Sequence, residues 1–236
     1  MNKLVETVLR EINSENNPYF VDLKNKTFSQ EDFIETQIQF FFAVTFFSRP
    51  MAALAAKIPS PKLRLEIMRN VWEEHGEGDP QRIHGVTFQT LLKRLASVTP
   101  EKIEARSLWP EVRQFNTLLA GVCVIDEYLI GCATMGMVER MFCDISYWTA
   151  QGIINNGWLS SDQMIHYDLH KDLDVRHSQD FFDVLSASWN ENPETQYYIE
   201  QGLRLGATAF YSLYEGLHRA RKRRWIRNVT GPHSRA

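Results

Sequence analysis

The sequence predicts an all-α protein, and three observations predict it. Apolar residues recur at the three- and four-residue spacing of amphipathic helices along most of the chain. No segment keeps the alternation of apolar and polar residues that marks a half-buried strand. Glycine, proline and asparagine gather in short clusters between the helical segments, which indicates short loops. We therefore expect residues 1–236 to form a single-domain bundle of about seven helices.

Capping and breaking residues divide the chain into these helices. Ser29, followed by two acids, is a typical N-cap, and the helix that it opens is expected to kink or stop at Pro50. Pro61 fits the first turn of the next helix, which the segment 76–80, with two glycines and a proline, interrupts. The predicted helical segments are, in order, 1–16, 29–50, 61–75, 83–95, a short one after 100, 110–155, 166–185 and 193–224.

Composition and charge argue against a disordered or fibrous chain and against a protein that binds nucleic acid or membranes through its overall charge. The 44% hydrophobic and 23% charged residues are typical of a globular chain, and a net charge of −3 gives no reason to expect nucleic acid or an anionic membrane as a partner. The basic run from Arg219 to Arg224 is interpreted as a solvated helix end.

The sequence shows no clear membrane span, signal peptide, disulfide pattern or zinc-binding pattern. The most apolar stretch, Ile38 to Phe47, is about half the length needed to cross a bilayer, and the N-terminus lacks the features of a signal peptide. Cys123, Cys132 and Cys143 form no pattern of a disulfide framework or zinc site, so we interpret them as buried thiols and expect a cytoplasmic protein.

The strongest indication of a metal site lies between His166 and His177. His170, Asp174 and His177 are four and then three residues apart, so on an α-helix their side chains project from one face. Two imidazoles and a carboxylate make a poor apolar contact but form half of a site for a divalent metal. His166 lies one turn earlier and fits either a ligand or a hydrogen-bonding partner of one.

Two other segments supply acids for such a site. The sequence WEEHGEGDPQRIH contains four acids between Glu73 and Asp79, followed by His84. Glu139 stands inside an apolar helical run, where a carboxylate is costly unless it is paired or bound to a metal. Glu127, twelve residues earlier on roughly the same face, is the competing buried acid.

The order and spacing of these three segments resemble those of the haem-oxygenase-like diiron oxidases. That superfamily includes CADD-type proteins, fatty-acid decarboxylases and N-oxygenases. The resemblance covers about Pro61 to Phe182 and lies in EEHGEGDPQRIH, MVERM and HKDLDVRH. It implies a haem-oxygenase-like bundle of the TenA, PqqC and CADD type. The metal ligands that it implies are Glu74, His84, Glu139, His170, Asp174 and His177.

For the first of these ligands, Glu74, the nearby Glu77 is an alternative. Glu74 matches the longer form of the first motif, ten residues before His84, whereas Glu77 matches a shorter form, seven residues before it. Glu77 would share a face with His84 only on a continuous helix. The glycines and proline of the segment 76–80 argue against one, so Glu74 is favoured.

The resemblance also implies a function. Two iron ions, Fe2+ or Fe3+, and O2 as co-substrate would make the protein a non-haem diiron oxidase or oxygenase. We expect a small apolar or amino-acid-derived substrate, a homodimer, and neither a nucleic-acid nor a membrane partner. Two alternatives stay open: a TenA- or PqqC-like enzyme of cofactor metabolism that does not use two irons, and a non-catalytic CADD-type interaction module with an exposed apolar patch.

The positions of tyrosines and phenylalanines indicate which reaction of the superfamily is favoured and where a substrate could bind. One route in the superfamily consumes a protein tyrosine to make p-aminobenzoate. Val138 and His166 stand where the resemblance leads us to expect tyrosines, so this route is disfavoured, although Tyr147 and Tyr167 are expected near the site. The phenylalanines between 40 and 47 are interpreted as core, with a substrate pocket as the alternative.

Overall fold

The structure, a computed structural model, describes residues 1–164 and 166–227, without the side chains of residues 168–174. The part of the chain that it describes contains ten α-helices and no strand beyond an isolated bridge between Arg106 and Ile226. This confirms the all-α prediction, with more helices than expected. The helices are α1 (Asn2–Ile12), α2 (Pro18–Lys24), α3 (Gln30–Lys57), α4 (Pro61–Glu74), α5 (His84–Ala96), α6 (Pro100–Glu104), α7 (Pro110–Val124), α8 (Tyr128–Asn155), α9 (His166–Ser188) and α10 (Pro193–Ala220).

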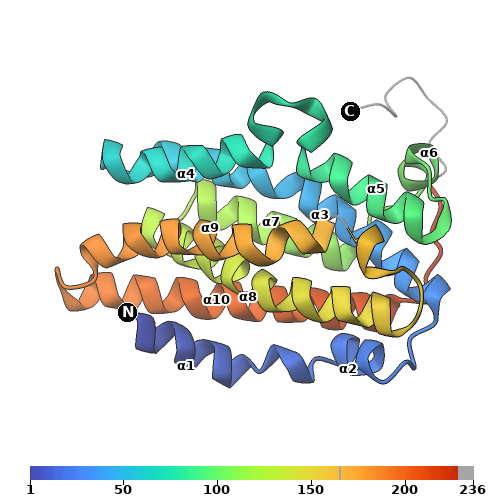
Figure 1. The fold of residues 1–236 in the computed structure, drawn as a ribbon. Coiled ribbons are helices and arrows are strands. Elements are labelled where there is room, and N and C mark those ends of the chain that lie inside the picture. Colours follow the sequence, from blue (N-terminus) through green and yellow to red (C-terminus); the bar gives the residue numbers. More distant parts are fainter. Residues whose placement is uncertain (165, 228–236) are drawn as a thin grey trace.

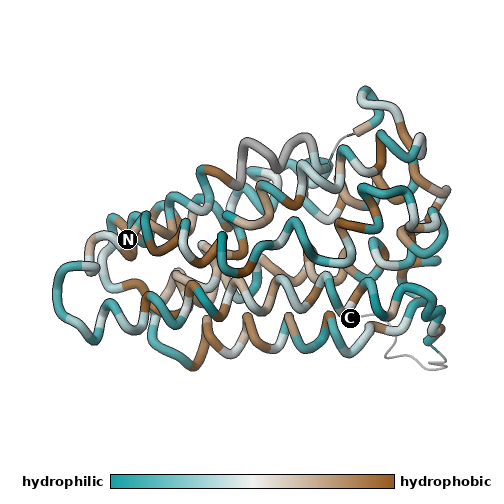
Figure 2. The backbone as a smooth tube through the Cα atoms, turned by 90° about the horizontal axis from the view of Figure 1, so that it is seen from below, coloured by the Kyte–Doolittle hydropathy of each residue, from teal (hydrophilic) through white to brown (hydrophobic). Residues whose placement is uncertain are grey.

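Helix α8 is the central helix of the bundle. It packs against α2, α7, α9 and α10, while α3 packs against α4, α5 and α7. Figure 1 shows α4 and α5 along one side of the molecule and α1 and α2 along the opposite side, with α9, α8 and α10 between them. Figure 2 shows hydrophilic and hydrophobic residues interspersed along the coloured parts of the backbone, as expected for helices buried on one side. Because α9 contacts α4, α5 and α8, side chains from all four helices can meet.

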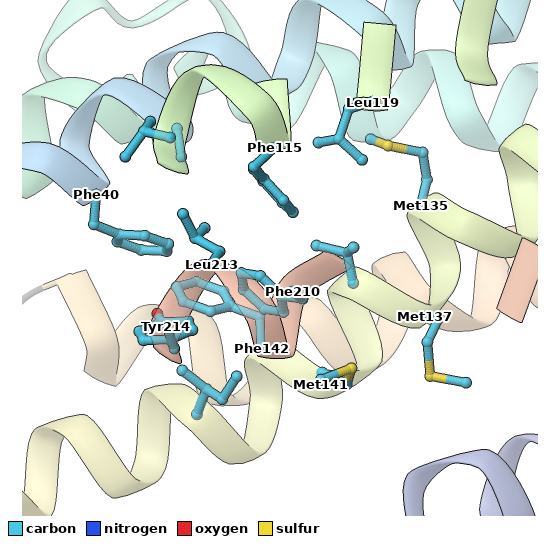
Figure 3. Close-up of a cluster of buried hydrophobic side chains, with 14 of the residues drawn as sticks. Phe40, Phe115, Leu119, Met135, Met137, Met141, Phe142, Phe210, Leu213 and Tyr214 are labelled. Carbon is cyan, nitrogen blue, oxygen red and sulfur yellow. The ribbon is translucent and has the colours of Figure 1, made fainter. Parts of the chain in front are cut away.

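The apolar core fills the space between α3, α7, α8 and α10. Figure 3 shows aromatic side chains from all four helices facing one another. The rings of Phe115 and Phe210 stack with centroids 5.6 Å apart, and Phe142 lies 6.1 Å from Phe210. Such contacts add about 0.5–1.5 kcal/mol per pair to the burial of the rings themselves.

Two glycines of α10 bring its backbone directly onto α8. A Cβ atom at Gly202 would lie 2.5 Å from the main-chain oxygen of Ile130, and one at Gly206 would lie 2.5 Å from that of Thr134. The Thr134 hydroxyl also donates to the main-chain oxygen of Gly202, at 3.1 Å. The helix contact thus depends on the absence of side chains at these two positions.

The predicted helix 110–155 is interrupted between α7 and α8. Lys57, from the end of α3, donates to the main-chain oxygens of Val124 (3.4 Å) and Asp126. The Asp126 carboxylate accepts from the backbone N–H of Glu127 at 2.9 Å, just before α8 begins. These contacts satisfy main-chain groups that a helix end leaves open. Glu127 is exposed, so its interpretation as a buried acid was wrong.

Helix α3 does not stop at Pro50. The proline removes one backbone hydrogen bond, but Met51, Leu54 and Ala55 beyond it are fully buried, and their packing holds the helix to Lys57. Among the described residues, α3 is the one helix long and apolar enough to cross a membrane. Half of its most apolar window is buried against the rest of the bundle, as in the core helix of a globular fold.

The N-terminal prediction was partly right. Helix α1 ends at Ile12 and a 3-10 turn follows over Ser14–Asn16, so the predicted segment 1–16 is almost entirely helical. The short helix α2 was not predicted. Ser29 caps α3 as expected, because its hydroxyl accepts from the backbone N–H of Asp32 at 3.1 Å.

Helix α10 ends at Ala220, before the predicted end at Arg224, and the basic segment that follows it is more than a solvated terminus. Arg223 donates to Glu111 of α7 at 2.8 Å, and Arg224 donates to Asp32 of α3 at 2.6 Å. Both arginines are about three-quarters buried, so these ion pairs fasten the end of α10 to two other helices.

Asp22 of α2 is expected to stabilise the fold in a pH-dependent way. Its Oδ2 lies 2.6 Å from Nε2 of His218, and Thr27 donates to its Oδ1 at 2.9 Å. The hydrogen bond from His218, then that from Thr27, lowers the pKa of Asp22 below its usual 3.8. Because the folded-state pKa is the lower one, the stabilisation is complete above the unfolded-state pKa and is lost as the pH falls through the folded-state pKa.

We therefore expect Asp22→Asn to have a lower melting temperature than the wild type at about pH 6, and the difference to shrink towards about pH 3. Thermal denaturation followed by circular dichroism measures this. A difference that stays constant or grows on acidification would contradict the argument.

Candidate metal centre

Three buried side chains from three helices meet inside the bundle. Glu74 is the last residue of α4, Glu139 lies in the middle of α8, and His177 lies in α9. Their ligand atoms all lie within 4.8 Å of one another, and Nδ1 of His177 is 3.9 Å from Oε1 of Glu139. Oxygen and imidazole nitrogen donors gathered in a space of this size suit a divalent metal ion such as Fe(II).

A tight turn between α4 and α5 brings His84 back to Glu74. Nδ1 of His84 lies 2.8 Å from Oε1 of Glu74. Gly76 has φ +71°, and a Cβ atom there would lie 2.8 Å from the main chain of Arg82 and Ile83, so glycine is required. This is the break that the sequence predicts between the two helices, and it lets residues ten apart touch.

Glu77, the rival of Glu74, lies outside this group. Its side chain is half exposed and pairs with Arg82 at 3.1 Å. Glu74 is buried and is a member of the three-residue group, so the geometry favours Glu74 over Glu77. Its role as a metal ligand stays a prediction.

Two further predicted ligands lie on α9. The side chains of His170 and Asp174 lie outside the described residues, so their placement relative to the group stays a prediction. His166, at the start of α9, is fully buried. Its Nδ1 lies 3.0 Å from the hydroxyl of Thr87, and that hydroxyl donates to the main-chain oxygen of His84 at 2.9 Å. Since the hydroxyl has one hydrogen, Nδ1 of His166 is the donor in this contact.

Beside the candidate ligands lies a small, largely apolar cavity of about 50 Å³. Glu74, His84, Glu139 and His166 form its polar wall. Its apolar lining comes from α3, α7, α8 and α10 and consists of Phe40, Ala43, Val44, Phe47, Phe115, Val138, Phe142 and Phe210. The phenylalanines of α3 thus serve both predicted purposes, since Phe40 belongs to the core and also lines the cavity.

Of the two tyrosines expected near the site, one lies there. Tyr147 is 57% exposed on the surface of α8, so that expectation was wrong. Tyr167 is fully buried, with its ring centroid 6.2 Å from that of Phe142 in the cavity wall. Its hydroxyl donates to the side-chain oxygen of Gln37, whose amide nitrogen donates to the hydroxyl of Tyr19 at 2.8 Å. Burial raises the pKa of Tyr167 well above its usual value of 10.0.

Glu73 also lies at the site, although the sequence predicts no specific role for it. Glu73 is adjacent to Glu74, yet its side chain faces α9, and its Oε2 lies 2.7 Å from Nε2 of His177. The cluster WEEH alone does not show which glutamate faces which way. Only the position of α9 beside α4 does.

The three cysteines are buried, as the sequence predicts. Burial raises the pKa of Cys123 to about 12, and it raises that of Cys132 still further. A thiol becomes a nucleophile by losing its proton, so these two are held in an unreactive form.

The fold and the buried acid–histidine group define a haem oxygenase-like helical protein with a candidate metal centre. Solved structures show the same fold. A domain of unknown function with a heme oxygenase-like fold from Shewanella denitrificans has a TM-score of 0.78 at 12% identity, over 94% of this chain and 93% of that one. A CADD-like protein of unknown function from Nostoc punctiforme gives 0.74 at 13% identity, over 92% and 96% of the two chains. A TenA homolog from Pseudomonas syringae pv. tomato gives 0.71 at 13% identity, over 91% and 92%.

The sequence itself places the chain in a family. It belongs to the family of iron-containing redox enzymes, whose sequence profile matches residues 35–211 and therefore includes all the predicted ligands. No curated protein matches the chain significantly. The resemblance inferred from the three motifs is confirmed at the level of fold and family.

Proposed function

We propose that this protein is a non-haem diiron oxidase or oxygenase that uses O2 to oxidise a small apolar or amino-acid-derived molecule. The observation that carries the proposal is the meeting of Glu74, Glu139 and His177 beside an apolar cavity. Three ionisable groups in the interior of a bundle cost several kcal/mol of desolvation, and metal coordination is one of the few arrangements that offsets this cost. Membership in a family of iron-containing redox enzymes supports the choice of iron.

The proposed ligands come from four helices, α4, α5, α8 and α9. Glu74, His84, Glu139 and His177 would hold the two ions together with His170 and Asp174. Bound iron would supply the electrons and coordination positions for reaction with O2. Carboxylates suit the higher oxidation states of iron, and imidazoles suit its ferrous state, so the mixed set fits a site that cycles between them.

The cavity indicates the kind of substrate. Its charged and imidazole groups all lie on the wall formed by the candidate ligands, and the rest of its lining is apolar. Burial of apolar surface contributes about 25 cal/mol per Å² to binding, so the aromatic lining favours a substrate with an apolar body. A single polar group on that substrate would face the candidate ligands.

The alternatives are less well supported. A TenA-like hydrolase would need a reactive cysteine, and burial disfavours the thiolate at Cys123 and Cys132. An interaction module finds some support in Leu65, Met68 and Trp72, which are exposed on one face of α4. That reading, however, gives no reason for three possible metal ligands, Glu74, Glu139 and His177, to meet in the interior of the bundle.

Anaerobic reconstitution tests the proposal. We expect the metal-free chain to take up about two ferrous ions. The iron-loaded protein should then consume O2 faster with one class among fatty acids, amino acids and amines, measured with an oxygen electrode. Zinc-loaded protein, which has the same donors but no redox chemistry, is the matched control and should be inactive. Substrate turnover that survives removal of iron by a chelator would contradict the proposal.

A further inference from the structure

We propose that Glu73 is a positioning residue that orients His177 for metal binding, an inference that rests on the proposed function. The Glu73 side chain is 9% exposed, and its Oε2 lies 2.7 Å from Nε2 of the fully buried His177. Arg176 donates to the same oxygen, and Nε of Arg69 lies 3.8 Å from the other. The carboxylate is thus held by two cations and directed at one imidazole.

The imidazole of His177 connects this carboxylate to the candidate metal centre. Its Nε2 faces Glu73, and its Nδ1 faces Glu139, with 3.9 Å between Nδ1 and Oε1. An ionised carboxylate can only accept a hydrogen bond, so the hydrogen of the neutral imidazole resides on Nε2. A metal ion requires a nitrogen without hydrogen, and that nitrogen is then Nδ1, the one on the inner side.

Glu73 is not itself a ligand in this arrangement. Adjacent residues on a helix point about 100° apart, so Glu73 and Glu74 cannot face the same ion from α4. Glu74 faces the centre, whereas Glu73 contacts the opposite edge of the His177 ring.

The backbone of His177 is held from the same helix. The side-chain amide of Asn70, one turn before Glu74 in α4, lies 3.4 Å from the main-chain oxygen of His177. Glu73 and Asn70 therefore fix the ring and the backbone of one residue from a single neighbouring helix. A carboxylate behind a metal-binding histidine also raises the basicity of the coordinating nitrogen, and loss of such a partner typically weakens metal binding by about 10–100-fold.

The first test measures ferrous iron affinity by anaerobic competition with a chelator. We expect Glu73→Ala to bind iron about 10–100-fold more weakly than the wild type. Glu73→Gln keeps an acceptor oxygen but loses the charge and should fall between the two. Glu66→Ala is the matched control, because Glu66 lies on α4 and pairs with Arg69 but not with His177. We expect its affinity to stay within about twofold of the wild type, as for a surface ion pair.

Wild-type affinity in Glu73→Ala would overturn the inference. So would an equal loss in Glu73→Ala and Glu66→Ala, because the effect would then come from Arg69 or from helix stability. Far-ultraviolet circular dichroism of each variant establishes that the bundle is folded.

The second test needs no metal. Nitrogen chemical shifts of the His177 ring, measured by NMR in the metal-free protein, distinguish the two tautomers. We expect the hydrogen on Nε2 in the wild type and a mixture of tautomers in Glu73→Ala. A wild-type ring with its hydrogen on Nδ1 would refute the role of Glu73. Because this measurement is independent of iron, it decides on Glu73 even if reconstitution contradicts the proposed function.

Discussion

Glu139→Gln is expected to reduce the iron content from about two ions per chain to one or fewer while leaving the protein folded. The substitution keeps the shape of the side chain but removes the negative charge and one carboxylate oxygen from the centre of the group. Glu139 lies in the most buried part of α8, where no other described acid replaces it. Iron analysis after anaerobic reconstitution and desalting measures the effect.

The same substitution should act on stability in the opposite direction. Removal of a buried charge in the metal-free protein is expected to leave the melting temperature unchanged or to raise it by a few degrees. Glu127→Gln is the matched control, since Glu127 is an exposed acid at the start of the same helix. It should retain both irons. A Glu139→Gln protein with full iron content would exclude Glu139 as a ligand.

Gly206→Ala is expected to be strongly destabilising. The new methyl group would lie 2.5 Å from the main-chain oxygen of Thr134 and 3.1 Å from its Cα, so α8 and α10 would have to separate. Overpacking of this kind costs on the order of 2 kcal/mol, which in a chain of this size lowers the melting temperature by about 4–8 °C.

Gly121→Ala is the matched control for that substitution. Gly121 lies in α7, and a Cβ atom there would meet nothing within 4 Å. Alanine favours the helix by up to about 1 kcal/mol over glycine, so the melting temperature should rise by about 2–4 °C. Opposite signs for the two substitutions identify the close helix contact as the cause. Two increases of similar size would show that the contact at Gly206 adjusts without cost.

The sequence predicts the fold class because helical periodicity is a local property. The starts of helices are local as well, since residues such as Ser29 and Pro61 cap or open a helix within their own segment of the chain. Where the prediction failed, the decisive contact is distant in sequence. The interruption between α7 and α8 is held by Lys57, which belongs to α3. The continuation of α3 past Pro50 likewise depends on burial that a local pattern does not contain.

The residues of the candidate site were likewise predictable only where the signal is local in sequence. Glu139 was recognised because its neighbours in the chain are apolar. Glu74 was favoured because glycines and a proline directly after it predict the end of its helix. Glu73 could not be separated from Glu74 by spacing. Its direction became visible only with the imidazole of His177 beside it.

The hydrogen-bonded chain from Tyr167 through Gln37 to Tyr19 has a consequence for the proposed oxidase function. A tyrosine gives up an electron easily only if its hydroxyl proton can leave at the same time. The described contact of the Tyr167 hydroxyl is with an amide oxygen, which is a very weak base, and the chain ends at Thr36, whose hydroxyl donates to the main-chain oxygen of Phe33. A proton from Tyr167 therefore has no basic group to move to along this route. Tyr167, whose ring lies beside Phe142 of the cavity wall, is therefore expected to resist oxidation by the proposed chemistry.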